Sequence, residues 1–95
     1  MLTGKQKSFL RSMANTERAL FQVGKEGCTY NLYNTISDSL EAHELLKVSV
    51  LKTCPQSVRE VALDIAGHTN AEIVQIIGRV VLLYRPSKKK VIVLP

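Results

Sequence analysis

The fold is set by residues 19–43, ALFQVGKEGCTYNLYNTISDSLEAH, in which a strand pattern passes into a helix pattern through two glycines. Residues 19–23 are short, apolar and rich in strand formers, and a glycine ends them. After the second glycine, Thr29 or Asn31 can cap a helix. Apolar residues then recur at helical spacing as far as about His43. This stretch predicts a strand, a tight loop and a helix, in that order.

An amphipathic helix is predicted ahead of this stretch, over about residues 4–15. Its apolar side chains repeat on one face, as a helix packed on a core requires. Thr3 and Gln6 stand three residues apart at its start. This is the spacing of a capping box, in which each side chain bonds the other residue's backbone N–H. A capped helix should therefore precede the first strand.

Four more elements are predicted after His43. In order, they are a strand over residues 46–50, a helix that begins at Pro55 and stops at Gly67, and strands over residues 73–77 and 80–84. Gly78-Arg79, between the last two strands, leaves room only for a tight turn, which predicts an antiparallel hairpin. Residues 91–94 are predicted to be an extended tail that pairs at a sheet edge.

These elements give the order αβαβαββ in a chain of 95 residues, enough for one domain with its own core. Alternating helices and strands are typical of an α/β fold. We therefore expect a single domain over residues 1–95, with residues 86–95 as a basic tail. The four strands should form one mixed sheet, mostly parallel with an antiparallel hairpin. The three helices should cover a single face of that sheet.

Charge is unevenly distributed along the chain, whose formal net charge is +5. Residues 1–25 carry five basic side chains and one acidic one, and residues 73–95 carry five basic side chains and no acidic one. Residues 26–72 carry seven acidic and three basic side chains. If the two basic ends meet in the fold, they form a positive face suited to a polyanion such as nucleic acid.

Most catalytic and membrane functions lack support in the sequence. No apolar run approaches the roughly 20 residues of a membrane span, and no signal peptide is evident, so we expect a cytoplasmic protein. His43, His68, Cys28 and Cys54 show no metal-ligand spacing, and no nucleophile motif is present. We expect no enzyme activity, catalytic residue, metal or cofactor. The two cysteines should be partly buried apolar residues, with a disulfide between them as the alternative.

The loop Gly24-Lys25-Glu26-Gly27 gives the strongest indication of function. Two glycines three apart allow a ligand to approach the backbone closely and allow positive φ angles. The helix start that follows offers free N–H groups and the positive end of the helix dipole. Lys25 can add a full positive charge to the same phosphate. The loop is therefore suited to clamp a sugar-phosphate backbone, as the GXXG loop of KH domains does. An ordinary turn is the alternative.

Four motifs follow one another along the chain. They are LTGKQK at residues 2–7, LFQVGKEG at residues 20–27, HELLKV at residues 43–48 and IIGRVVLLYR at residues 76–85. Together they resemble the CRM domain (chloroplast RNA splicing and ribosome maturation), and most closely its free-standing bacterial YhbY-type members. The resemblance covers essentially the whole chain.

The resemblance implies an αβαβαββ domain similar to KH domains and to the C-terminal domain of translation initiation factor three. It implies RNA binding and, for the bacterial members, association with precursors of the large ribosomal subunit. The family's phosphate-gripping motif maps onto Gly24, Lys25 and Gly27. The sequence differs from the family pattern at two positions. Asn15 stands where the family commonly has a histidine, and Glu26 puts a negative charge beside the phosphate-gripping motif.

The predicted RNA-binding set extends beyond the loop, Glu26 included, to basic residues near both ends. These are Lys5, Lys7, Arg11, Arg79, Arg85, Lys88, Lys89 and Lys90. Lys7 and Arg11 could equally be a solvated helix face, and Tyr84 could stack on a base or lie at the edge of the core. We predict a monomeric RNA-binding protein whose partner is rRNA in precursor large subunits. A DNA-binding protein and a small RNA-processing enzyme are the alternatives.

Overall fold

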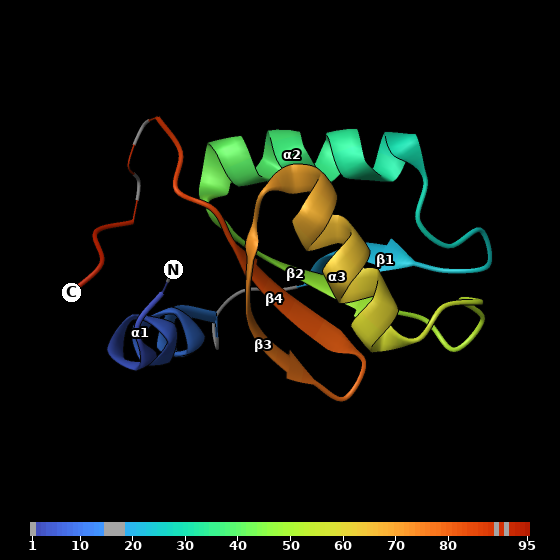
Figure 1. Cartoon of the computed structure of the whole chain (residues 1–95), viewed down its shortest axis with the longest axis horizontal. Coiled ribbons are helices and arrows are strands. Elements are labelled where there is room, and N and C mark those ends of the chain that lie inside the picture. The colour runs from blue at the N-terminus through green and yellow to red at the C-terminus, as the bar shows by residue number, and fades with distance from the viewer. Residues whose placement is uncertain (1, 15–18, 89, 91) are drawn as a thin grey trace.

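The structure, a computed structural model, describes residues 2–14, 19–88, 90 and 92–95. Its elements, in chain order, are α1 (Gly4–Ala14), β1 (Ala19–Val23), α2 (Tyr30–His43), β2 (Leu45–Val50), α3 (Val58–Thr69), β3 (Glu72–Ile77) and β4 (Val80–Tyr84) (Figure 1). The predicted order αβαβαββ and the predicted mixed four-stranded sheet are confirmed.

The strands lie in the order β1-β2-β4-β3. β1 and β2 are parallel, with Val23 level with Val50, whereas β4 is antiparallel to both β2 and β3. The prediction of a mostly parallel sheet is therefore wrong. The turn at Gly78-Arg79 folds β4 back between β3 and β2, so two of the three strand pairs in the described sheet are antiparallel (Figure 1).

Helices cover both faces of the sheet, because the central strand β4 is apolar on both sides and β2 adds apolar residues to each. Leu46 and Val48 of β2 point into the larger core, which α2 and α3 cover. Leu45, on the opposite face of the same strand, packs with Leu10 of α1 in a second core. The prediction that all three helices share one face is wrong for α1, which lies apart from α2 and α3 (Figure 1).

α3 begins and ends later than predicted. Pro55 does not start the helix, because Ser57 caps it: the Ser57 Oγ accepts the Glu60 N–H at 3.1 Å, and the Glu60 carboxylate accepts the Ser57 N–H at 3.3 Å. Gly67 does not stop it either. The helix runs on to a left-handed Asn70 with a φ of 56°, a conformation that asparagine tolerates better than most residues.

Glu44, a buried carboxylate rather than a solvated one, anchors Ser87 and Ile92 of the C-terminal tail. Glu44 is fully buried. One carboxylate oxygen accepts the Ser87 N–H at 2.6 Å and the other accepts the Ile92 N–H at 2.5 Å. Ile92 also packs against the core beneath α1. The prediction of a tail paired at a sheet edge is wrong, because no residue in the described part of the tail belongs to a strand.

Replacing Glu44 by alanine should lower the free energy of unfolding by about 2–3 kcal/mol, because the N–H groups of Ser87 and Ile92 would lose a charged acceptor. Urea denaturation followed by circular dichroism measures this loss. Glu41→Ala is the matched control: its half-exposed carboxylate pairs with Arg85 at 3.5 Å, so it should cost less than about 1 kcal/mol. Equal losses in the two variants would contradict the anchoring role of Glu44.

Candidate nucleic-acid interface

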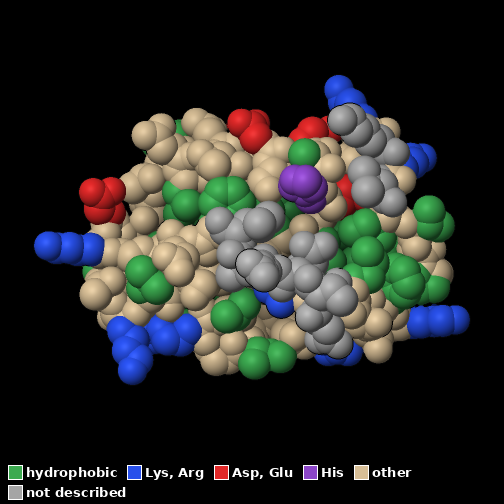
Figure 2. Space-filling view, turned by 180° about the vertical axis from the view of Figure 1, so that it is seen from behind, with side chains coloured by type: hydrophobic (Ala, Val, Ile, Leu, Met, Phe, Trp, Pro, Cys, Tyr) green, Lys and Arg blue, Asp and Glu red, His purple; other side chains and the backbone are tan. Residues whose placement is uncertain are grey.

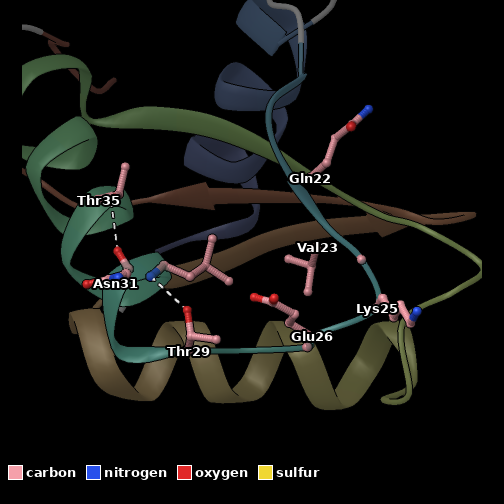
Figure 3. Close-up of a pocket in the computed structure, with 10 residues that line it drawn as sticks. Gln22, Val23, Lys25, Glu26, Thr29, Asn31 and Thr35 are labelled. Carbon is pink, nitrogen blue, oxygen red and sulfur yellow. Dashed lines mark hydrogen bonds between the residues drawn. The ribbon is translucent and has the colours of Figure 1, made fainter.

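The Gly24–Gly27 loop forms a tight turn at the end of β1. The Gly27 N–H donates to the Gly24 carbonyl at 2.9 Å, and Gly27 has a φ of 69°, which glycine adopts without strain. Lys25 and Glu26, in the middle of the turn, are exposed. Figure 3 shows their side chains diverging, with Glu26 over the hollow beside the loop and Lys25 away from it.

Gln56, in the segment between β2 and α3, braces the loop from behind. Its side-chain oxygen accepts the Cys28 N–H at 3.1 Å, and its side-chain nitrogen donates to Asp64 of α3 at 2.7 Å. The same oxygen would lie 3.0 Å from a Cβ added to Gly27, so the packing there admits only glycine comfortably. Gln56 is not among the predicted residues, because its partners lie 28 and 8 residues away and leave no local signal.

Arg79 lies at the same end of the sheet. Its guanidinium donates to the Val50 and Leu51 carbonyls, each at 2.7 Å. A Cβ added to Gly24 would lie 3.3 Å from the Leu51 side chain, so Arg79 and the loop share a neighbour. Lys52 follows Leu51 and is exposed. The predicted set omitted Lys52, which no local motif marks, although its neighbours Leu51 and Thr53 both lie within 4 Å of a Cβ added to Gly24.

The N-terminus of α2 carries a single side-chain cap, whereas α1 and α3 each carry a reciprocal capping box. Thr3 and Gln6 exchange two side-chain bonds at 3.0 and 3.1 Å, which confirms the predicted capping box of α1, and Ser57 and Glu60 do the same for α3. In the described structure, Thr29 caps α2 by accepting one first-turn N–H at 3.2 Å. The first turn of α2 contains no acidic residue. Its remaining N–H groups and its dipole are therefore available to an anion.

A hollow of about 400 Å³ lies between the loop, β1 and α2, as Figure 3 shows. Its size falls within the range of small-molecule sites. Gln22 of β1 and Asn31 of α2 bring exposed amide side chains to its wall, and the Thr35 hydroxyl donates to the Asn31 carbonyl at 2.7 Å. The hollow is thus a recess of mixed polar and apolar lining beside a loop that carries one positive and one negative side chain.

The other predicted basic residues are not gathered at the loop. Lys5, Lys7 and Arg11 belong to α1, which packs on the sheet face opposite α2 and α3. Lys88 and Lys90 are exposed on the tail, and Lys89 lies outside the described residues. Figure 2 shows Lys and Arg side chains at separate places around the rim of one face of the molecule. The expected single positive face is therefore absent from the described residues on this side.

Arg85 and Tyr84 have structural roles that their sequence context did not reveal. The Arg85 guanidinium donates to the Ser37 hydroxyl and carbonyl at 3.0 and 2.8 Å and to the Thr69 carbonyl at 2.8 Å. Arg85 therefore connects α2 to the end of α3, and few of its N–H donors remain for a phosphate. Tyr84 is 5% exposed and belongs to the core beneath α1, so it lies at the core and is not a base-stacking residue.

The described residues contain no cluster of three His, Cys, Asp or Glu that could hold a metal ion. Among their helices, none is long and apolar enough to span a membrane. Cys28 and Cys54 are free and half-buried, as predicted. Burial raises the pKa of the Cys28 thiol, and burial also raises the pKa of Tyr33 to about 12, so neither group is poised to exchange protons near neutral pH.

Comparison with known proteins gives consistent matches over the whole chain. The family model described as the CRS1 / YhbY (CRM) domain matches residues 2–85. The chain is 47% identical over 89 residues to "Probable RNA-binding protein YqeI" of Bacillus subtilis, covering 94% of this chain and 93% of that protein. It is 35% identical over 94 residues to an "RNA-binding protein" of Haemophilus influenzae, covering 99% and 95%. The solution structure of the hypothetical protein SAV1595 from Staphylococcus aureus superposes with a TM-score of 0.81 at 45% identity, covering both chains completely.

Two glycine-to-alanine variants should change stability in opposite directions. Gly27→Ala forces a side chain into a φ of 69° and against Gln56, and it should lower the free energy of unfolding by about 1–2 kcal/mol. Gly67→Ala, inside α3 with open space around it, should raise it by about 0.5–1 kcal/mol. Thermal and urea unfolding measure both changes. A stable Gly27→Ala protein would contradict the braced geometry of the loop.

Proposed function

Because the chain belongs to the CRS1 / YhbY (CRM) family, we propose that it binds RNA by gripping the sugar-phosphate backbone with the Gly24–Gly27 loop. The relatives named above as RNA-binding proteins support RNA as the ligand. The observation that supports the loop most strongly is its place directly before the N-terminus of α2, where Thr29 accepts one first-turn N–H and no acidic side chain lies in the first turn.

The chemistry of the loop suits a phosphate. The glycines let a backbone oxygen approach closely, and the first-turn N–H groups of α2 supply donors and a positive dipole end. Lys25 adds a full charge, and Arg79 and Lys52 lie at the same end of the sheet. Glu26 leans over the hollow in Figure 3, on the other side from Lys25. A phosphate therefore binds on the Lys25 side, and the hollow takes a less charged part of the nucleotide.

The RNA that we propose as partner is rRNA in precursors of the large ribosomal subunit, bound in the cytoplasm by a monomeric, non-catalytic protein. Incomplete subunits expose rRNA surfaces that mature particles cover, and a protein that reads RNA shape can distinguish the two. General binding to DNA or to other RNAs is the second candidate, because phosphate contacts alone carry no sequence information. Competition between rRNA and DNA of equal length separates these candidates.

Lys25→Asp should weaken rRNA binding severalfold or more and lower the log–log salt slope by about 0.7–0.9, the loss expected for one phosphate contact. Filter binding at several salt concentrations measures both quantities. Folding should hardly change, since surface substitutions normally shift stability by only about 0.5 kcal/mol. Lys88→Asp makes the same charge change on the exposed tail and should cost less. Equal losses would mean that net charge, and not the loop, sets the affinity.

The assembly role predicts where the protein sediments in a cell lysate. On a sucrose gradient it should travel with precursor large subunits, and its depletion should slow large-subunit maturation. The wild-type protein should restore the gradient profile, whereas Lys25→Asp should not, because it lacks the phosphate contact. A protein that stays at the top of the gradient, or travels only with mature ribosomes, would refute the assembly role and leave RNA binding in place.

A further inference from the structure

Tyr30 is an exposed aromatic ring beside the phosphate-binding loop. Its side chain is 81% exposed, and it is the first residue of α2, three residues after Gly27. Its Cα therefore lies within about 11 Å of the Gly27 Cα. Thr29, and not Tyr30, makes the helix cap. Tyrosine has only a moderate helix propensity, and this exposed side chain gains little hydrophobic free energy from burial. Helix formation and core packing therefore do not explain the presence of Tyr30.

The ring of Tyr30 rests against a rigid support. Tyr30 and Tyr33 are in edge contact, with ring centroids 6.5 Å apart and an interplanar angle of 78°. Tyr33 is stacked on His68 of α3, with centroids 3.9 Å apart and planes within 5° of parallel. The His68 Nδ1 lies 2.9 Å from the Asp64 carbonyl oxygen. Two elements thus hold the supporting ring in place, which reduces the entropy that Tyr30 loses when it binds a ligand.

We propose that Tyr30 is a stacking platform for an unpaired nucleobase of the strand whose phosphate the loop grips. This inference rests on the proposed RNA-binding function. Stacking on an aromatic ring tolerates any base, because every base has a π face. Glu26, the exposed acid of the loop, repels phosphate but does not repel a neutral base. The loop contacts phosphates that single strands and duplexes share, whereas Tyr30 requires a base with a free face. The pair therefore selects single-stranded or bulged RNA over continuous duplex.

The test compares two probes that differ only in their bases. One is a single-stranded oligoadenylate of eight nucleotides, and the other is an abasic ribose-phosphate oligomer of the same length. Tyr30→Leu should lose roughly five- to a hundredfold in affinity for the oligoadenylate and nothing for the abasic oligomer. Tyr30→Phe, which keeps the ring, should bind both as the wild type does. Lys25→Asp should lose affinity for both probes, because both carry the phosphates.

Each outcome of this comparison has one meaning. If Tyr30→Leu binds oligoadenylate as the wild type does while Lys25→Asp binds it weakly, the stacking platform is wrong and the loop function stands. If Tyr30→Leu loses equally toward both probes, the residue shapes the loop and does not stack, which also overturns the proposal. If Lys25→Asp keeps full affinity for both probes, the phosphate-gripping function itself fails.

Tyrosine fluorescence gives a second readout, independent of affinity. The chain has no tryptophan and three tyrosines, and Tyr30 is far more exposed than Tyr84, which is 5% exposed. A base stacked on Tyr30 should quench the protein's emission on titration with oligoadenylate but not with the abasic oligomer. In Tyr30→Phe the quenching should disappear while binding persists. Quenching of unchanged size in that variant would place the base elsewhere and refute the proposal.

Discussion

The central strand β4 is buried on both faces, and most of the architecture follows from this constraint. Val81 and Leu83 of β4 face α2 and α3, whereas Leu82 and Tyr84 face α1. A strand with apolar side chains on both sides needs cover on both sides. One helix must therefore leave the α2–α3 layer, and β1 must take an edge position. That edge position leaves the end of β1 free to continue into the Gly24–Gly27 loop.

The loop owes its shape to contacts from parts of the chain that lie far away in sequence. β1 and β2 run parallel and end together, so the segment after β2 passes behind the loop. Gln56 bonds the loop backbone and α3 at once, and Arg79 holds the end of β2 through two carbonyls. A phosphate site built from backbone N–H groups works only if those groups already point at the ligand. In the proposed function, Gln56 and Arg79 supply this preorganisation through their contacts with the backbone.

Local patterns predicted the elements and the loop, because strand alternation, glycine turns and capping spacing are properties of neighbouring residues. These patterns failed where a feature depends on residues that are far apart in the sequence. A chain this short suggests that three helices form one layer, whereas the continuous apolar run of β4 is the signal for burial on both sides. The sequence suggested that Arg85 is available to RNA. In the fold, its guanidinium donates hydrogen bonds to Ser37 and Thr69. Gln56 had no signal at all.

The basic residues of this chain therefore divide by what their donors already do. The Arg85 guanidinium donates its hydrogen bonds to the protein. Arg79 donates to two backbone carbonyls but is exposed to solvent, and Lys25 is exposed on the turn of the loop. Dispersed surface charge draws any polyanion toward the protein and raises the association rate, but it does not orient the ligand. Orientation needs a fixed donor beside a fixed shape. In this fold the two coincide at the end of β1, where the turn meets the start of α2 and the exposed Tyr30 ring, and in the proposed function discrimination among nucleic acids arises there.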